Sequence, residues 1–464
     1  MADGLKFGTS GLRGLASELT GVATRRYVAA FLTHLGKRKV VGYSRVFFAR
    51  DRRESSPAIA RDVAMAIRAA GLIPVDCGVL PTPALALHAM AEGGPAIMIT
   101  GSHIPADRNG LKFYTPQGEI TKDDELGILG ALVDADVAEG SAEAEDGFAL
   151  AGDRYRQRYR NFINTGALQA WRIGVFEHSS VATDQIASIL HRAGAEVIRL
   201  GASPVFVPVD TEAFSDSTYE PRYGWIATHH VDAIVSTDGD GDRPLLIDGE
   251  GNFVRGDVLG LVTAGYLWAD TVVTPVTSNS AIERLGVFRH VERTKVGSPY
   301  VIQGMEEAAH DGGTVIGFEA NGGTLLGTDI ELDGRQLSRL PTRDAILPLL
   351  CAFATAARDG KTIAQLVASL PMRPALSDRL TDVATDRSTA MARRIASEPA
   401  YAKDFFSGIG DVESINTMDG PRVTLSSGDI VHYRPSGNAP ELRCYVEGRT
   451  MEREIGRASC RERV

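Results

Sequence analysis

Three aspartates separated by single glycines form one segment whose spacing suits metal chemistry. Asp238, Asp240 and Asp242 follow a predicted strand at 231–237 and precede Arg243. Carboxylates this close repel one another unless a cation lies between them, and the glycines let the backbone curl so that all three converge. Hard oxygen ligands with room for a phosphate oxygen favour Mg²⁺. The spacing predicts a Mg²⁺ site, with a surface cluster of Asp-Gly turns as the alternative.

A second polar loop, T-G-S-H-I-P at 100–105, follows an apolar strand and contains Ser102 and His103. Open α/β sheets bind ligands in the loops beyond the carboxyl ends of their strands. A serine there could be a nucleophile if its surroundings activate it, and Lys112 could bind phosphate or donate a proton. No G-x-S-x-G elbow is present, which disfavours acyl hydrolysis. Ser102 and His103 could equally be polar turn residues.

Two further loops carry groups that suit a phosphorylated sugar. In G-F-E-A-N-G-G (317–323), Glu319 and Asn321 could hydrogen-bond to sugar hydroxyls, although the motif alone favours a plain loop. The segment at 433–447 offers two guanidinium groups, a hydroxyl, an amide and a backbone N–H, which together match a phosphate. These groups belong to Arg434, Ser436, Gly437, Asn438 and Arg443. A turn between two strands with surface arginines is the alternative.

The elements that must position these loops follow one recurring pattern. An apolar strand, an amphipathic helix, a glycine and another strand occur at 45–78 and again at 171–201, and a looser third copy begins with a strand at 287–295 and a helix at 299–310. Strands alternating with helices of this length predict βαβ units and largely parallel sheets. The pattern predicts three related α/β domains, although any α/β enzyme can show it.

The pattern ends near Met372, after which short strands joined by turns predict a smaller α+β domain. We expect α/β domains at 1–150 with the serine loop, at 151–255 with the metal-binding loop and at 256–371 with the sugar-binding loop. The α+β domain with the phosphate-binding loop is expected at 372–454. The basic segment at 455–464 has no helical periodicity and is interpreted as a possible cloning tail.

Composition narrows the class of protein. The chain has 464 residues and a net charge of −10, which makes nucleic acid an improbable partner. Its four cysteines are scattered without a C-x-x-C pair, which argues against a zinc site and a secreted disulfide scaffold. No signal-peptide pattern and no apolar run of about 18 residues is present. We therefore expect a cytoplasmic protein without a membrane partner.

The four loops in this order, together with the opening K-F-G-T-S-G-L-R-G at 6–14, resemble the α-D-phosphohexomutases, the family of phosphomannomutases and phosphoglucomutases. The resemblance runs over nearly the whole chain, from 6 to 447. It implies four domains around a central cleft, three of them related α/β domains with mixed, mostly parallel sheets and the fourth a smaller C-terminal α+β domain. It also implies Mg²⁺, a hexose phosphate substrate, a hexose 1,6-bisphosphate intermediate or activator, and a monomer or homodimer.

The resemblance also implies a role for each motif residue. Ser102 would carry the phosphoryl group and supply a further Mg²⁺ ligand beside Asp238, Asp240 and Asp242. Arg243 would sit beside the transferring group, and Lys112 would be a candidate for proton transfer. The implied catalytic set is Ser102, His103, Lys112, Arg13 and Arg243. Glu319 and Asn321 would bind sugar hydroxyls, while the non-reacting phosphate would be held by Arg434, Ser436, Gly437, Asn438 and Arg443.

The sequence departs from the family pattern in three loops, the first of which is the serine loop, where Ile104 stands at a position that is asparagine in many members. The sugar loop usually resembles G-E-x-S-G-H, but here Asn321 stands at the serine position and Gly323 at the histidine position, so an acid–base role for that histidine does not carry over. The phosphate loop reads S-G-N-A-P rather than S-G-T-E-P. The motif combination predicts a bacterial-type phosphomannomutase that interconverts mannose 6-phosphate and mannose 1-phosphate. The alternatives are a phosphoglucomutase, a dual-specificity enzyme, a phosphatase that uses Ser102, and a non-catalytic sugar-phosphate binder.

Overall fold

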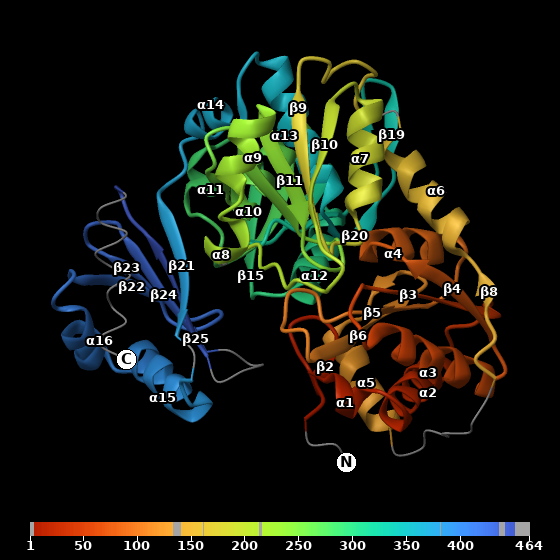
Figure 1. Cartoon of the computed structure of the whole chain (residues 1–464). Helices are drawn as coiled ribbons and strands as arrows, with labels where there is room; N and C mark the ends of the chain where they lie inside the picture. The colour runs from red at the N-terminus through yellow and green to blue at the C-terminus, as the bar shows by residue number, and fades with distance from the viewer. Residues whose placement is uncertain are drawn as a thin grey trace.

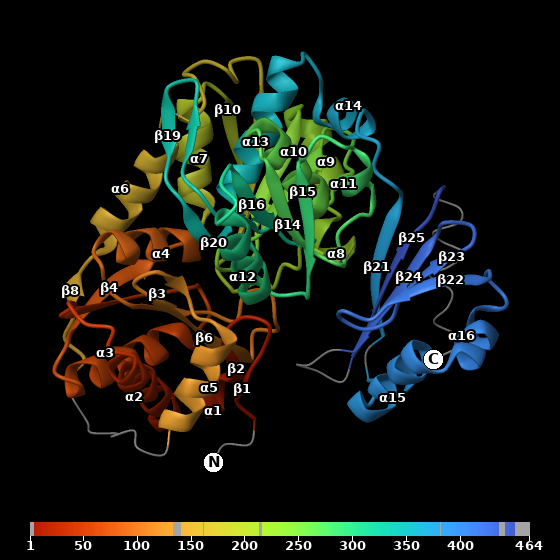
Figure 2. The ribbon, with the colours of Figure 1, turned by 180° about the vertical axis from the view of Figure 1, so that it is seen from behind.

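The computed structural model describes residues 4–132, 141–160, 162–212, 216–380, 382–435 and 441–450. Over these residues the chain forms three mixed β-sheets, a two-stranded hairpin and one antiparallel sheet. The first sheet and its helices lie together, the second and third pack against each other above it, and the fourth lies to one side (Figures 1 and 2). The α/β class with a smaller C-terminal α+β part is confirmed.

The first sheet runs in the order β1-β2-β6-β5-β3-β4-β8, with β7 paired to β6. Its strands are β1 (Lys6–Phe7), β2 (Leu12–Leu15), β3 (Arg45–Arg50), β4 (Ile73–Val79), β5 (Ala96–Ile99), β6 (Arg108–Thr115), β7 (Gly118–Glu119) and β8 (Glu145–Asp146). The helices of this part are α1 (Ala16–Leu19), α2 (Val22–Lys37), α3 (Ser56–Ala69), α4 (Thr82–Ala91) and α5 (Lys122–Ala131). The fully buried β5 lies at the centre of the sheet, where its apolar side chains pack on both faces.

The second sheet runs in the order β10-β9-β11-β12-β13. Its strands are β9 (Arg172–His178), β10 (Glu196–Ala202), β11 (Ala233–Thr237), β12 (Pro244–Asp248) and β13 (Phe253–Val254). The accompanying helices are α6 (Phe148–Tyr159), α7 (Thr183–Arg192), α8 (Asp216–Tyr219) and α9 (Arg222–His229).

The third sheet runs in the order β15-β14-β16-β17-β20, and β18 and β19 form the separate hairpin. The strands are β14 (Thr271–Pro275), β15 (His290–Thr294), β16 (Val315–Phe318), β17 (Thr324–Leu326), β18 (Ile330–Leu332), β19 (Arg335–Leu337) and β20 (Leu340–Asp344). The helices are α10 (Gly256–Tyr266), α11 (Ala281–Arg284), α12 (Ser298–Ala309), α13 (Ile346–Arg358) and α14 (Ile363–Ala368). Helix α13 is apolar on nearly all sides and is buried along almost its whole length, as its composition predicts.

The three mixed sheets share one topology. In each, the first strand along the chain lies between the second and third, which both run parallel to it. A fourth strand then pairs antiparallel with the third, which gives the orders β4-β3-β5-β6, β10-β9-β11-β12 and β15-β14-β16-β17. This shared order supports three related α/β units. The elements of the predicted third copy, β15, α12 and β16, are present in the structure. However, β15 is the second strand of the third unit and not its first. The true first strand is β14, and the helix after it, α11, has only four residues and gives too short a periodic signal.

The fourth sheet is entirely antiparallel, in the order β21-β25-β24-β23-β22. Its strands are β21 (Ala375–Leu380), β22 (Val412–Asn416), β23 (Arg422–Leu425), β24 (Ile430–Pro435) and β25 (Leu442–Glu447), and its helices are α15 (Thr385–Ser397) and α16 (Pro399–Phe406). The possible tail at 455–464 lies outside the described residues.

The apolar cores follow the same division. The largest core joins the second and third sheets through residues of α6, β9, α7, α10 and α13. The first sheet has separate cores on its two faces, and the fourth sheet has a core of its own with α15 and α16. Within the described residues, no helix combines the length and the hydropathy needed to cross a membrane.

Candidate active site

Three of the predicted loops occupy equivalent positions in the three mixed sheets. The serine loop (100–107) joins β5 to β6, the Asp loop (238–243) joins β11 to β12, and the sugar loop (319–323) joins β16 to β17. Each therefore follows the carboxyl end of a parallel strand, where α/β sheets bind ligands. Side-chain contacts described below show that the three loops meet at one buried site.

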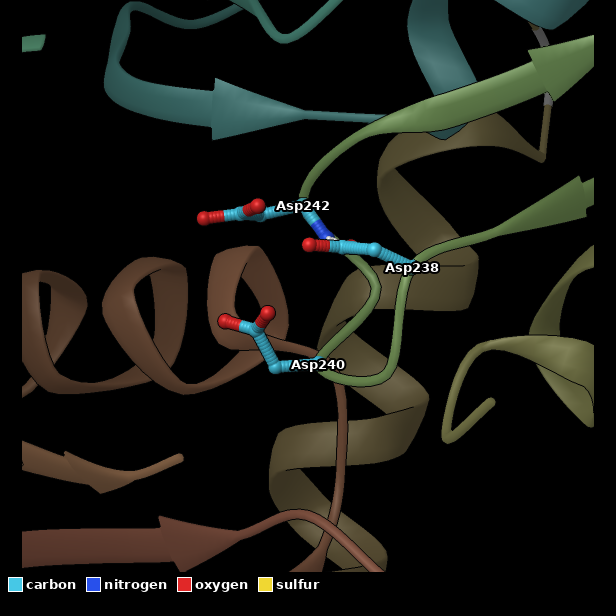
Figure 3. A group of neighbouring side chains, drawn as sticks. All are labelled: Asp238, Asp240 and Asp242. Atoms are coloured by element: carbon cyan, nitrogen blue, oxygen red, sulfur yellow. Dashed lines mark hydrogen bonds between the residues drawn. The ribbon is translucent and has the colours of Figure 1, made fainter. Parts of the chain in front are cut away.

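The Asp loop brings its three carboxylates together, as the glycine spacing predicts. Asp238, Asp240 and Asp242 are buried, and each offers a carboxylate oxygen within 4.8 Å of the others. Figure 3 shows the three side chains extending from one turn toward a shared space. Gly241 has a φ of +73°, and a Cβ there would come within 3.0 Å of Pro81 and Ala182. Glycine is thus required for the turn that converges the carboxylates.

The donor set of this loop fits a divalent cation. Asp240 Oδ1 and Asp242 Oδ1 are buried, and neither has a hydrogen-bond partner among the described residues. Burial raises the pKa of Asp238 well above its usual range, and the neighbouring Asp240 and Asp242 raise it further. A bound cation would offset this repulsion and use the oxygens that lack partners. The observations are consistent with a metal site formed by these three aspartates.

Ser102 faces the Asp loop from a strained backbone position. Its side chain is buried, and its Oγ donates a hydrogen bond to Asp238 Oδ2 at 2.5 Å. Its φ is +55°, which is uncommon for a residue other than glycine and clusters at functional sites. Gly239 lies so close that a Cβ there would come within 3.0 Å of the Ser102 carbonyl oxygen. The predicted nucleophile and the predicted metal ligands are therefore in direct contact.

Arg53 holds the serine loop in place. This buried guanidinium donates hydrogen bonds of 2.6–2.9 Å to the carbonyl oxygens of three loop residues, Ser102, Ile104 and Pro105, and of Arg108 at the start of β6. Asp51 pairs with Arg53 at 3.1 Å and also accepts hydrogen bonds from Ser56 and Thr100. The D-R-R-E-S-S segment at 51–56 is thus a strand-to-helix turn that supports the serine loop from behind.

Lys112 connects the first sheet to the Asp loop. It lies on β6, and its Nζ donates to Asp240 Oδ2 at 2.6 Å and to Asp242 Oδ2 at 2.5 Å. Burial alone would raise the pKa of Asp242, but the nearby Arg343, Lys112 and Arg243 outweigh it and hold that pKa below its usual range. Asp242 is therefore charged at neutral pH, as a cation ligand must be.

His103 and Arg243 lie beside Ser102. His103 Nδ1 is 3.2 Å from Ser102 Oγ and 3.0 Å from Arg243 Nη1. Because arginine can only donate, this nitrogen of His103 is the unprotonated one. Burial lowers the pKa of His103 well below its usual value, and Arg243 and Arg13 lower it further. The imidazole is therefore neutral at physiological pH.

Arg13 adds a further cation to the site. Burial lowers its pKa to about 10, and Arg243 and Arg343 add to that effect. Arg13 Nη2 and Arg243 Nε are buried polar atoms without a hydrogen-bond partner among the described residues. Buried guanidinium N–H groups that make no hydrogen bond are suited to bind an anionic group such as a phosphoryl group.

The sugar loop contributes a buried carboxylate. Glu319 Oε2 accepts a hydrogen bond from Arg343 Nη1 at 3.0 Å, and the same guanidinium donates to Asp242 Oδ2 through Nε at 3.1 Å. Asn321 folds back on its own turn, because its Oδ1 accepts from the Gly323 N–H at 2.9 Å. The structure brings Glu319 to the Asp loop, while the side-chain carbonyl of Asn321 is engaged within the sugar loop itself.

The predicted phosphate-binding residues are only partly described. Arg434 on β24 donates to Asp419 Oδ2 at 2.8 Å, and Arg443 on β25 pairs with the partly buried Glu212 at 3.3 Å. Burial raises the pKa of Glu212, with the charge of Arg443 acting against that effect. Ser436, Gly437 and Asn438 lie outside the described residues. Arg443 is also among the cations that lower the pKa of His103.

Sequence reasoning missed several residues of this site. Arg343 on β20 contacts both the Asp loop and the sugar loop, and its Nη2 donates to Ser10 Oγ at 3.2 Å. Glu119 on β7 accepts hydrogen bonds from Ser10 at 2.6 Å and from Ser298 at 2.9 Å. Ser10 lies within the G-T-S-G-L-R-G opening, which was a usable signal. Arg343 and Glu119 lie in no such motif, and only the folded contacts reveal them.

Three mixed sheets and one antiparallel sheet around these loops define the four-domain fold of the phosphohexomutases. The family models for phosphoglucomutase/phosphomannomutase alpha/beta/alpha domains I and III match residues 4–136 and 255–373, together more than half of the chain. The chain belongs to the phosphoglucomutase/phosphomannomutase family. The expectation of an enzyme, an isomerase of this family, is thereby confirmed.

Individual relatives agree with this assignment. A phosphomannomutase of Sinorhizobium fredii is 48% identical over 453 residues, which cover 96% of this chain and 95% of that protein. A phosphomannomutase of Salmonella muenchen is 43% identical, covering 97% and 93%. The crystal structure of a putative phosphomannomutase from Thermus thermophilus superimposes with a TM-score of 0.77 at 22% identity, over 98% of this chain and 97% of that one. This last similarity concerns the fold.

Proposed function

We propose that the protein is a phosphomannomutase that interconverts mannose 6-phosphate and mannose 1-phosphate through a hexose 1,6-bisphosphate. The observation that carries the proposal is the contact of Ser102 Oγ with the buried Asp cluster, 2.5 Å from Asp238. It combines a candidate phosphoryl carrier with candidate ligands for Mg²⁺. The relatives that are 43–48% identical bear the name phosphomannomutase, which favours mannose over glucose.

In this proposal Ser102 carries the phosphoryl group that is exchanged with the sugar. The Oγ–P bond breaks as a bond forms from phosphorus to the free hydroxyl of the hexose phosphate, and the second phosphate later returns to Ser102. Asp238, Asp240 and Asp242 would hold Mg²⁺ with an oxygen on Ser102. When bound, Mg²⁺ supplies positive charge that offsets the charge on the transferring group.

Three cations of the chain would stabilise the charge on the transferring group, and a fourth would hold the non-reacting phosphate. Arg13 and Arg243 have buried guanidinium atoms without hydrogen-bond partners among the described residues, and Lys112 binds two of the aspartates. Such preorganised charge acts strongly because the site excludes water. Arg443 is the fourth cation. It would hold the non-reacting phosphate with Arg434, Ser436, Gly437 and Asn438, so that either end of the sugar can face Ser102.

The transfer needs an acceptor for the proton of the reacting hydroxyl and a proton donor for the leaving Ser102 Oγ, and the sugar loop has no histidine for either role. Lys112 is the first candidate for proton transfer. His103 is the second, because its unprotonated Nδ1 lies 3.2 Å from Ser102 Oγ and its pKa is well below its usual value. A neutral imidazole can accept a proton at physiological pH, whereas a charged ammonium can only donate one.

A phosphoglucomutase or an enzyme that accepts both sugars is the nearest alternative, since mannose and glucose differ by one hydroxyl orientation. A phosphatase that uses Ser102 is less well supported, because hydrolysis needs no loop for a second phosphate.

We also propose the domain limits 1–150, 151–255, 256–371 and 372–454 for the four units. The protein would act in the cytoplasm.

A coupled assay tests the proposed substrate. Mannose 1-phosphate and glucose 1-phosphate are compared by kcat/KM with Mg²⁺ and a trace of the matching hexose 1,6-bisphosphate, and EDTA without Mg²⁺ is the control. We expect a preference for mannose of more than about tenfold, which corresponds to about 1.4 kcal/mol of transition-state discrimination. Equal values would indicate dual specificity, and a preference for glucose would contradict the proposal.

A further inference from the structure

Arg343 is a buried arginine that contacts all three mixed-sheet units. Arg343 lies on β20, and its guanidinium donates hydrogen bonds to the carboxylates of Asp242 at 3.1 Å and Glu319 at 3.0 Å. It also donates to the hydroxyl groups of Ser298 at 3.3 Å and Ser10 at 3.2 Å. Ser10 and Ser298 in turn donate to the same oxygen of Glu119. A single side chain thus fixes the Asp loop, the sugar loop and the N-terminal strands relative to one another.

The stem of Arg343 runs directly across Gly323 of the sugar loop. A Cβ at position 323 would come within 2.5 Å of Arg343 Cδ, 2.7 Å of its Cγ and 3.0 Å of its Cβ. The backbone of Gly323 has no positive φ, so its conformation alone would allow another residue. Since the guanidinium is held at several points, the stem cannot move aside without breaking those contacts. The space that a side chain at position 323 would occupy is taken by Arg343.

Charge explains why this arrangement needs a cation. Glu319 and Asp242 come from different sheets and are both buried, and each accepts a hydrogen bond from the same guanidinium. Without that guanidinium, two desolvated carboxylates would face each other and repel. The planar fork of arginine can bridge them, whereas the point charge of lysine cannot match both geometries at once.

We propose that Arg343 is the positioning residue that sets the sugar loop against the Asp loop, and that position 323 is glycine because the stem of Arg343 crosses it. The inference rests on the proposed function, in which Glu319 binds sugar hydroxyls. In the family pattern position 323 carries a histidine, so in this chain the place of that side chain is filled by an arginine from a different strand. Arg343 orients Glu319 and does not itself exchange protons.

The first experiment removes the guanidinium and keeps the stem. Arg343→Met should raise KM for the hexose 1-phosphate that the wild-type enzyme uses by about tenfold, the order expected for losing charged hydrogen bonds. The value of kcat should change less than about threefold, because a mispositioned Glu319 weakens ground-state and transition-state binding alike. Arg335→Met, which removes an arginine paired with Asp333 outside the site, is the control and should leave both values unchanged.

An unchanged KM in Arg343→Met would overturn the positioning role. A fall in kcat with the wild-type KM would overturn it as well, because it would indicate a part in the chemical step or a general loss of folded enzyme. Circular dichroism and the urea unfolding midpoint of each variant separate folded from misfolded protein.

The second experiment tests the steric link in a double-mutant cycle. Gly323→Ala should destabilise the wild-type chain in urea unfolding and have a much smaller effect in the Arg343→Ala background, where Cγ and Cδ are gone. If Arg343→Ala does not fold, the comparison is Gly323→Ala with Gly130→Ala, since a Cβ at Gly130 meets nothing within 4 Å. Of these two variants, only Gly323→Ala should raise KM. Additive effects in the cycle, or equal effects of the two glycine variants, would refute the link.

The two readouts separate the inference from the function on which it rests. If the wild-type enzyme turned over neither mannose 1-phosphate nor glucose 1-phosphate, the proposed function would fail. The unfolding cycle needs no substrate and would still decide whether the stem of Arg343 is what requires glycine at position 323.

Discussion

At the residue scale, the site is defined by buried charges that compensate one another. Ser102, Lys112 and the three aspartates are all nearly inaccessible, and each contacts another member of the group. Sequence could predict these residues because the Asp loop and the serine loop are short contiguous motifs with distinctive chemistry. It could not predict Arg343 or Arg53, because an arginine within a strand or turn carries no motif and acts only through contacts made by folding.

Replacing Ser102 tests the phosphoryl-carrier role directly. Ser102→Ala should abolish mutase turnover, while a sugar phosphate still binds, because the cations and Glu319 remain in place. Turnover is measured in the coupled assay, binding by calorimetry with mannose 1-phosphate, and phosphorylation of the purified protein by intact mass. Ser338→Ala, at an exposed serine just after β19, serves as the matched control. Full activity of Ser102→Ala would show that the phosphoserine mechanism is wrong.

At the element scale, the fold places equivalent loops at equivalent strand ends. The glycine-punctuated βαβ patterns at 45–78 and 171–201 predicted two strands and one helix in each of the first two sheets. These are β3, α3 and β4 in the first sheet and β9, α7 and β10 in the second. In the third sheet the predicted unit began at its second strand, β15, because the four-residue α11 cannot give the periodicity of a longer helix. The antiparallel strands β6, β12 and β17, which close the loops, do not follow from the repeat pattern, since their pairing depends on contacts distant in sequence.

The serine loop depends on an element outside itself, the turn that carries Arg53. Arg53→Met should lower the free energy of unfolding by about 3 kcal/mol, because it leaves Asp51 as an uncompensated buried charge and removes the donors to four carbonyl groups. The value of kcat should fall by at least about tenfold, since Ser102 loses its fixed backbone position.

Urea unfolding and the coupled assay measure the two effects of Arg53→Met, with Arg61→Met on the exposed face of α3 as the control. A variant that is less stable but has wild-type kcat would show that the tether serves the fold alone.

At the scale of the whole molecule, the fourth sheet is attached by polar contacts. It has its own apolar core. The contacts with the third sheet include the Val296 N–H to Asp419 Oδ2 at 2.9 Å, the Ser280 N–H to the Glu447 carboxylate at 3.1 Å and Asn279 Nδ2 to the Arg373 carbonyl at 2.7 Å. Separating two parts that are joined by polar contacts costs less free energy than separating two parts that share an apolar core, because water can replace the polar contacts. We therefore expect the fourth sheet to move relative to its neighbours more easily than the second and third sheets, which share one core, move relative to each other.

Acid is also expected to destabilise the fourth sheet, through a buried histidine. His432 Nε2 donates to the Asp419 carbonyl oxygen at 2.7 Å, and its Nδ1 is buried without a hydrogen-bond partner among the described residues. Burial lowers the pKa of His432 to about 4, against about 6.5 in an unfolded chain. Between these values the unfolded state binds the extra proton, so the stability present above pH 6.5 is lost as the pH falls toward 4.

Between pH 7.5 and pH 5 the loss from this one group is about 2 kcal/mol. Scanning calorimetry should show a low-temperature transition that moves down over this pH range. In His432→Gln, whose amide can still donate to Asp419, that transition should move much less, whereas replacing the exposed His191 by Gln should leave the shift intact. A shift of equal size in His432→Gln and the wild-type protein would contradict the assignment, because another group would then be taking up the proton.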